Sequence, residues 1–368
     1  MTSWKRKLIH FFSNADDLID KLRFKFRHKF HLFDPVYICA YHSYGSQEVL
    51  NVRGRVLENK NITTAEDDDS FFENSLNMYK RFQSQEVAGA KLRVQYHEII
   101  YDTVTDKEGY FEVNVIPGKP LPEHLWHDVT IELVKSPMPF KGKVTAVARV
   151  MVPYSTSSYG VISDIDDTII ESFATRKLKM FRTVMLKNAR TRLPFEGVSA
   201  FYKALKKGPE GISENPFFYV SSSPWNLYDF LIDFLDINKI PEGPLLLKDL
   251  GFEKDKFISK GHKQHKLNEI TKILHKYPRL SFILIGDSGQ KDPIIYQEIV
   301  SLFPGRILAI YIRDVQLSER AKIVIDIAEK MQGDKTPMVL VENTVKAAEH
   351  AVLNHFILAE NKSTLCFY

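Results

Sequence analysis

Residues 159–170 read YGVISDIDDTII, and this stretch decides the fold. Its β-branched start predicts a buried strand. Three acids, Asp164, Asp166 and Asp167, follow within four positions, and crowded carboxylates repel one another unless a cation or a reaction uses them. Ligands of open α/β sheets bind where strands end. Asp164 and Asp166 therefore suit a nucleophile and a general acid around one phosphoryl group.

Other predicted strands also end in polar groups. An apolar run over 281–286 ends in Asp287, and Asp292 follows five residues later. Another run, over 217–220, ends in three serines, Ser221, Ser222 and Ser223. Lys266 opens a predicted helix just before the second acid pair. Each feature is weak alone, but their order and their position at strand ends strengthen the prediction of one site.

Together these motifs resemble the haloacid-dehalogenase superfamily and, more closely, the phosphatidate phosphatase catalytic-domain family of the fungal actin-patch type. The runs that carry the resemblance are GVISDIDDTI from 160, YVSSSPW from 219, FILIGDSGQ from 282 and IYIR from 310. It extends over roughly residues 35–360. The resemblance implies a Mg²⁺-dependent enzyme that hydrolyses phosphatidate to diacylglycerol and phosphate through an aspartyl-phosphate.

The resemblance also implies a role for each acid. Asp164 is the expected nucleophile, and Asp166 is the expected acid and base, with its backbone carbonyl toward the metal. Asp287 completes the cation site, and Asp292 orients Asp287 or a metal-bound water. Magnesium fits because it prefers a few carboxylates together with water and phosphate oxygens. We expect a structural role for Asp167.

Hydroxyl groups near the acids are the expected phosphate contacts. Ser221 would donate to a phosphate oxygen, and Ser222 is nearly as good a candidate. Ser223 better fits a helix cap, because Pro224 then occupies the first helical position. Thr168 would orient the Asp164 loop or contact the substrate.

A lysine is expected to neutralise the phosphate and the nucleophile. The family pattern favours Lys266, and Lys263 and Lys248 are rivals. His262 and His265 have a spacing that suits zinc, but no cysteine or further histidine cluster completes four ligands.

Three charged segments allow two interpretations each. The acid-free segment 176–192 is either a lid that binds an anionic amphiphile or a helix with solvated cations; its candidate substrate contacts are Arg176, Lys177, Lys179 and Arg182. The basic, aromatic segment 1–34 suits an anionic membrane surface or is a solvated tail. The acidic run 66–69 suits a helix start better than a metal site, because it lacks ligand spacing.

The composition of the chain is that of a soluble globular protein. Of its residues 44% are hydrophobic and 26% are charged, and its net charge is +4. Its length of 368 residues exceeds that of one typical core, so we expect two folded domains. No apolar stretch approaches the length of a membrane span, and the N-terminus is no signal peptide. Two cysteines fit a reducing cytoplasm. We expect a cytoplasmic protein, peripheral to membranes at most, with no nucleic-acid partner.

The pattern of strands and helices divides the chain into three parts. After the basic segment 1–34, residues 35–153 predict a small antiparallel β-sandwich domain, with a hairpin over 103–111. Residues 154–368 alternate strands with helices, which predicts a catalytic domain with a mostly parallel, Rossmannoid sheet. Predicted strands lie near 160–164, 217–221, 244–248, 282–286, 307–312 and 338–341. Predicted helices lie near 197–207, 224–236, 264–276, 293–302, 317–332 and 343–358.

Two other functions compete with phosphatidate hydrolysis. The same chemistry would serve a soluble phosphomonoester, such as a sugar phosphate or a polynucleotide-end phosphate. A catalytically silent scaffold would bind membranes or partners through the β domain. The intact set Asp164, Asp166, Lys266 and Asp287 argues against the scaffold.

Overall fold

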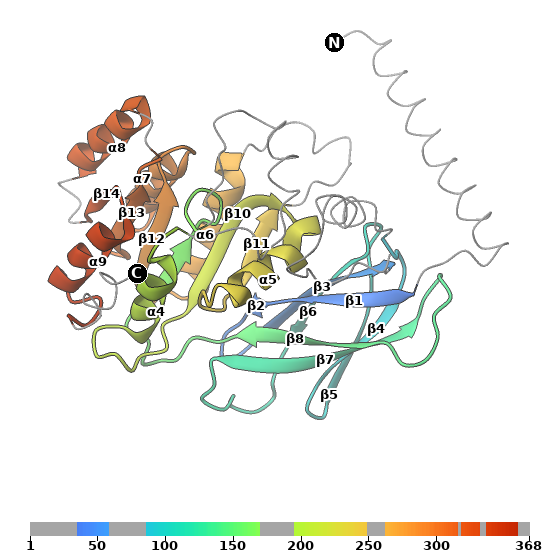
Figure 1. Cartoon of the computed structure of the whole chain (residues 1–368). Helices are drawn as coiled ribbons and strands as arrows, with labels where there is room; N and C mark the ends of the chain where they lie inside the picture. Colours follow the sequence, from blue (N-terminus) through green and yellow to red (C-terminus); the bar gives the residue numbers. More distant parts are fainter. Residues whose placement is uncertain are drawn as a thin grey trace, which may run out of the picture.

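A β-rich part of the chain lies beside an α/β part (Figure 1). The computed structural model describes residues 35–58, 86–169, 195–248, 262–315, 318–331 and 336–359. The β-rich part comprises β1 (Val36–Tyr41), β2 (Ser43–Tyr44), β3 (Leu50–Glu58), β4 (Lys91–Tyr96), β5 (Ile99–Val104), β6 (Tyr110–Val115), β7 (Trp126–Lys135) and β8 (Thr145–Met151). The segment 1–34 and the acidic run 66–69 lie outside the described residues.

The β-rich part has two sheets over one core. One sheet is antiparallel with the order β1-β3-β6; the other has the order β2-β8-β7-β4-β5, antiparallel except between β2 and β8. Alternate residues of β4 are buried, as a strand with one face on a core requires. Val52 and Val113 of the first sheet share a cluster with Leu92 and Ile131 of the second.

The predicted hairpin over 103–111 is wrong. β5 and β6 belong to different sheets, so the turn between them connects the two layers. The turn itself forms as expected: Gly109 has a φ of 78°, and the Asp106 side chain accepts backbone N–H bonds from Glu108 and Tyr110. Turn residues specify the local bend but not which strand lies opposite, and β5 pairs with β4 instead.

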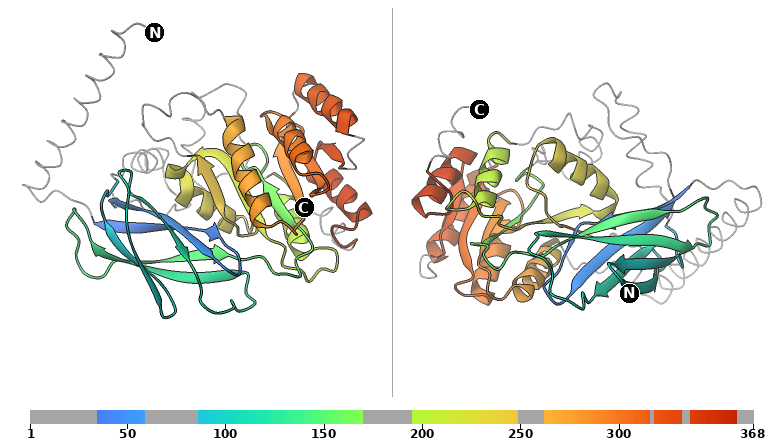
Figure 2. Two further views of the ribbon diagram at one scale, coloured as in Figure 1. Left: turned by 180° about the vertical axis from the view of Figure 1, so that it is seen from behind. Right: turned by 90° about the horizontal axis from the view of Figure 1, so that it is seen from below.

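The α/β part is built on a six-stranded parallel sheet. Its elements are β9 (Gly160–Ser163), α4 (Val198–Lys207), β10 (Phe217–Pro224), η1 (Trp225–Leu227), α5 (Tyr228–Ile237), β11 (Leu245–Lys248), α6 (His262–Lys276), β12 (Phe282–Asp287), α7 (Asp292–Leu302), β13 (Ile307–Arg313), α8 (Ser318–Lys330), β14 (Met338–Val341) and α9 (Thr344–Leu353). The strand order is β11-β10-β9-β12-β13-β14. Helices α4, α5 and α9 cover one face, and α6, α7 and α8 cover the other (Figure 2). The predicted mixed α/β architecture with a parallel sheet is confirmed.

The topology brings three strand ends together. β9 lies between β10 and β12, and its last residue, Ser163, pairs with Tyr219 on one side and Ile285 on the other. All four β9 residues are buried, as expected for a strand covered on both faces. Asp164 follows directly, and its backbone N–H donates to the Ile285 carbonyl at 2.9 Å. The predicted acids and serines therefore emerge at one edge of the sheet.

The two parts of the chain share a packed interface. Tyr41 of β1 stacks on Trp225, with ring centroids 4.3 Å apart. The Tyr277 hydroxyl, just after α6, donates to the Gly45 carbonyl at 2.8 Å, and Arg149 of β8 pairs with Glu242. Trp225 directly follows β10, and only Pro224 separates it from the serines of that strand, so the β-rich part supports one wall of the candidate site.

Two helix predictions need correction. Ser223 is not a helix cap: β10 extends through Pro224, η1 starts at Trp225, and no side chain caps η1. α9 ends at Leu353, short of the predicted end at 358. None of the described helices is long and apolar enough to cross a membrane.

Candidate active site

Asp164 is the buried centre of the candidate site. It lies just after β9 and is 1% exposed. Thr168 Oγ1, in the following turn, lies 3.5 Å from its Oδ2 as a donor. The predicted contact between Thr168 and the Asp164 loop is therefore present, although it is long for a hydrogen bond.

Lys266 is the cation at Asp164. It projects from the second turn of α6 and is fully buried. Its Nζ lies 2.9 Å from Asp164 Oδ1 and donates to Asp292 Oδ1 at 2.6 Å. Lys266 is thus the predicted lysine that reaches the site, whereas Lys248 ends β11 and the side chain of Lys263 lies outside the described residues.

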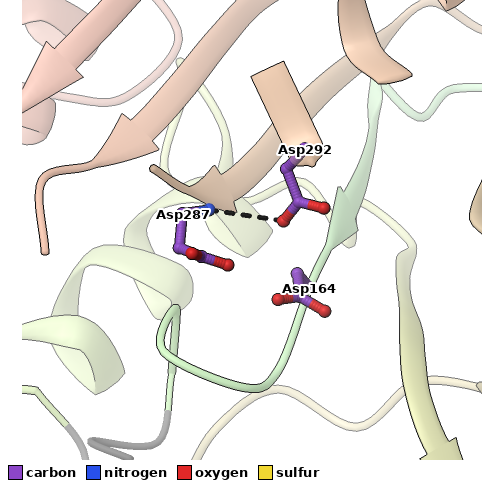
Figure 3. A group of neighbouring side chains, drawn as sticks. All are labelled: Asp164, Asp287 and Asp292. Atoms are coloured by element: carbon purple, nitrogen blue, oxygen red, sulfur yellow. Dashed lines mark hydrogen bonds between the residues drawn. The ribbon is translucent and has the colours of Figure 1, made fainter. Parts of the chain in front are cut away.

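Two further acids face Asp164 from the β12–α7 connection. Asp287 ends β12 and Asp292 begins α7, and both are buried (Figure 3). The Asp287 backbone N–H donates to Asp292 Oδ2 at 3.3 Å. Gly286 allows this approach, because a Cβ at that position would lie 2.6 Å from Asp292 Oδ2. The predicted role of Asp292 in orienting Asp287 matches this contact.

Serines of β10 hold the Asp166 side chain. Ser221 Oγ and Ser223 Oγ donate to Asp166 Oδ2 at 3.0 and 2.9 Å. The Ser223 backbone N–H in turn donates to Ser221 Oγ at 2.9 Å. Ser222 Oγ is buried and has no hydrogen-bond partner among the described residues. Ser221 therefore orients the acid in this structure, whereas Ser222, which lies between the two serines that contact Asp166, makes no such contact.

Gln290 links the acids and was assigned no role from the sequence. Its backbone N–H donates to Asp287 Oδ1 at 2.8 Å. Its side-chain Nε2 donates to Asp164 Oδ2 at 3.2 Å and to the Asp166 carbonyl at 3.1 Å. The SGQ run after Asp287 belongs to the resemblance, and that run was the sequence signal for Gln290.

Burial and like charges shift the pKa values of these acids. Burial raises the pKa of Asp164 well above its usual value; Lys266 opposes this shift, and Asp292 and Asp287 add to it. Burial and then Asp292 raise the pKa of Asp287 to about 8. Burial alone would lower the pKa of Lys266, but Asp164 and Asp292 outweigh burial and raise it. The ammonium group therefore stays charged, while the acids need additional positive charge to ionise together.

The acids form a group that could hold a metal ion. Asp164, Asp287 and Asp292 each offer an oxygen, and these oxygens lie within 4.8 Å of one another. When ionised, they carry three negative charges against the single positive charge of Lys266. Asp287 Oδ2 is buried and has no hydrogen-bond partner among the described residues. A buried carboxylate oxygen without a donor is unfavourable in a protein alone, so the residues present fit a hard cation.

Several predicted site residues cannot be placed. The basic segment with Arg176, Lys177, Lys179 and Arg182 lies outside the described residues. The zinc alternative at His262 and His265 also stays untested, because the His262 side chain lies outside them.

Comparison with known proteins confirms the resemblance to the phosphatidate phosphatase catalytic-domain family. Residues 159–314 match the family described as the catalytic domain of phosphatidate phosphatase APP1. The chain is 31% identical over 218 residues to phosphatidate phosphatase APP1 of Saccharomyces cerevisiae, covering 56% of this chain and 36% of that protein. It is 28% identical over 219 residues to an uncharacterized protein of Schizosaccharomyces pombe, covering 58% of this chain and 34% of that protein. The chain thus spans about a third of the length of these relatives.

Among solved structures, a carbohydrate acetylesterase from Xanthomonas citri aligns with a TM-score of 0.25 and 8% identity, over 82% of this chain and 67% of that chain. A likeness this low carries no argument about fold or function.

Proposed function

We propose, from the match of residues 159–314 to the APP1 catalytic-domain family, that this chain is a phosphoric monoester hydrolase acting on phosphatidate. The products are diacylglycerol and inorganic phosphate. One observation carries the chemical part of the proposal: Asp164 is buried at a strand end, with Lys266 2.9 Å away and Asp166 two residues on, held by two serine hydroxyls. This arrangement supplies a nucleophile, a neutralising cation and an oriented acid at one place.

In the proposed reaction, a carboxylate oxygen of Asp164 attacks phosphorus, and the bond from phosphorus to the ester oxygen breaks. Asp166 donates a proton to the leaving alkoxide, which becomes the hydroxyl of diacylglycerol. Asp166 then takes a proton from water, and the resulting hydroxide attacks the aspartyl-phosphate. Phosphate leaves and the Asp164 carboxylate is restored.

Other residues stabilise charge and hold the phosphate. Lys266 neutralises the nucleophile and the transferring phosphoryl group. Ser222 offers its free hydroxyl to a phosphate oxygen, and Ser221 can join it by releasing Asp166. Thr168 restrains the nucleophile loop. The proposed roles of Lys266 and Thr168 rest on their contacts with Asp164, and that of Ser222 rests on its place in the serine run of β10.

The proposed metal is Mg²⁺, held by the Asp164 and Asp287 carboxylates and the Asp166 carbonyl, with Asp292 orienting Asp287. When bound, it would lower the pKa values of the buried acids and screen the repulsion between Asp164 and an anionic substrate. The unpartnered Asp287 Oδ2 and the excess of acids over Lys266 support this assignment.

A curated relative and two basic segments support the proposed substrate and setting. The name of the Saccharomyces cerevisiae relative supports phosphatidate. The basic segment 176–192 and the N-terminal segment 1–34 suit an anionic membrane surface, so we propose a cytoplasmic enzyme that binds membranes peripherally. We also propose a haloacid-dehalogenase-like domain over 154–368, preceded by a β-sandwich domain over 35–153.

One assay tests this function. Phosphate release from phosphatidate, lysophosphatidate and soluble phosphomonoesters is measured with excess chelator and then with added Mg²⁺. The proposal predicts release from phosphatidate that chelator abolishes and Mg²⁺ restores. Turnover of soluble esters alone would replace the lipid substrate, and full activity in chelator would remove the metal. Activity on none of them would favour the scaffold.

A further inference from the structure

Gln290 holds two oxygens that the proposed function assigns to the metal. It lies half-buried in the loop between β12 and α7. Its Nε2 bonds Asp164 Oδ2 at 3.2 Å and the Asp166 carbonyl at 3.1 Å. A carbonyl oxygen and an ionised carboxylate only accept hydrogen bonds. The group between them must therefore be the –NH₂ end of the amide.

An amide –NH₂ and a cation exclude each other at this position. The –NH₂ group carries partial positive charge and has no lone pair for a metal. Mg²⁺ binds ligand oxygens at about 2.0–2.1 Å and tolerates little distortion. An amide –NH₂ within hydrogen-bond distance of the same two oxygens occupies the position that such an ion would take. Binding of the ion therefore requires the Gln290 side chain to turn away.

The backbone contact of Gln290 makes this turn a local event. Its N–H is tied to Asp287 Oδ1 at 2.8 Å, and that bond does not depend on the side chain. Rotation about the side-chain torsions is enough to move the amide while the loop stays in place. The Asp287 carboxylate stays anchored through one oxygen, and its other oxygen, Oδ2, remains available.

We propose that the Gln290 amide competes with Mg²⁺ for Asp164 Oδ2 and the Asp166 carbonyl. Gln290 is thus a positioning residue: it keeps the nucleophile loop ordered before the metal arrives, and it lowers the metal affinity of the site. This inference rests on the metal site of the proposed function and adds to it a residue that sets metal occupancy.

A purely structural role for Gln290 predicts the opposite result. If its hydrogen bonds only brace the loop, removing them should disorder the acids and weaken metal binding. If its side-chain oxygen were a metal ligand, removal should also weaken binding. Competition alone predicts tighter binding when the amide is lost, so the sign of the change separates these roles.

The test is calorimetric titration of Mg²⁺ into the metal-stripped full-length chain, repeated with Mn²⁺. Gln290→Met keeps the length of the side chain and removes both donors; Gln290→Asn keeps an amide that is too short to span the two oxygens. Gln264→Met is the matched control, because Gln264 is an exposed residue of α6 that bonds Asn268. We expect Mg²⁺ to bind about tenfold more tightly to both Gln290 variants, which corresponds to 1.4 kcal/mol, and with unchanged affinity to the control.

A thermal scan in chelator completes the test. Gln290→Met should melt at a lower temperature than wild type in chelator and gain more from added Mg²⁺. Equal or weaker Mg²⁺ binding by both Gln290 variants would overturn the competition, while the metal-dependent function would stand. Absence of binding to wild type and all variants would overturn the metal site and this inference together.

Discussion

At the residue scale, Lys266 and the acids stabilise one another only as a set. Lys266 is 2% exposed and contacts Asp164 and Asp292. Burial removes these charges from water, which is unfavourable, and their mutual attraction offsets that desolvation. A buried charge whose partner is removed has no such compensation. The site is therefore more sensitive to loss of one member than to changes at the surface.

Lys266→Met should lower the free energy of unfolding by about 3 kcal/mol, since it leaves buried carboxylates without their ammonium partner. Urea unfolding followed by circular dichroism measures this loss. Lys272→Met on the same helix is the control: Lys272 is exposed and pairs with Glu269, so the change should be within about 0.5 kcal/mol. Equal losses for both variants would contradict the account.

The pKa of Asp287 predicts how pH changes stability and metal binding. Its folded pKa of about 8 lies above the ordinary carboxyl value of 3.8, so at pH values between these two the folded state holds a proton that the unfolded state has released. The stabilising contribution of Asp287 is thus complete below about pH 4 and is lost as pH rises through about 8. Mg²⁺ needs the ionised form, so it should raise Tm more at pH 8.5 than at pH 6.5. A Mg²⁺ effect that shrinks as pH rises would show that Asp287 is not a ligand.

At the element scale, the end of β10 sets the position of Asp166, the proposed general acid. Ser221 and Ser223 both bond Asp166 Oδ2, and they can do so because β10 continues as a strand through Pro224. The sequence suggested a helix cap for Ser223, because the pair Ser-Pro is typical of helix starts. Pairing of Pro224 with Lys248 of β11 overrides that local signal.

Ser223→Ala should lower kcat about tenfold and change KM little, because Asp166 loses one of two hydrogen bonds that aim it at the leaving group. Steady-state kinetics on phosphatidate and on a soluble ester separate the two constants. Ser301→Ala, at an exposed site in α7, should have no effect. A rise in KM with unchanged kcat would mean instead that Ser223 binds the substrate.

The strands and helices of the α/β part could be predicted because short apolar runs that end in polar residues alternate with longer helical segments along this part of the sequence. The proximity of Asp164 and Asp287 could be predicted because strand ends of a parallel sheet meet at one edge. Lys266, which lies on a helix, was chosen over its rivals from the family pattern. Gln290 was missed because a lone glutamine carries no chemical signal until the fold places it between Asp164 and Asp166. The pairing of β4 with β5 was missed because alternation marks a strand but not its partner.

At the scale of the whole molecule, the β-rich part and the α/β part share buried clusters. Cys39 and Tyr41 of β1 pack in one cluster with Val161 and Tyr228, and Leu125 packs in another with Leu267. Domains joined by such an apolar interface are expected to move and unfold together. The β-rich part therefore stabilises the α/β part through these shared clusters, including the region next to the candidate site.

Tyr41→Ala should lower the free energy of unfolding by about 3 kcal/mol and keep a single calorimetric transition, because it removes a buried ring that stacks on Trp225. It should also lower kcat, since only Pro224 separates Trp225 from the β10 serines that hold Asp166. Val104→Ala on the exposed face of β5 is the control and should change stability little. Two separate transitions in the wild-type protein would contradict the shared interface.

The proposed function depends most on the proposed role of Asp164 as the nucleophile in phosphatidate hydrolysis. The most direct measurement compares phosphate release from phosphatidate in mixed micelles with Mg²⁺ for wild type, Asp164→Asn and Asp167→Asn. Asp167 has a φ of 59°, which asparagine tolerates, so it is an adjacent control for the same chemical change. The account predicts a loss of about 10⁴-fold or more for Asp164→Asn, with normal folding, and near-normal turnover for Asp167→Asn. Turnover of Asp164→Asn at the wild-type rate would contradict it.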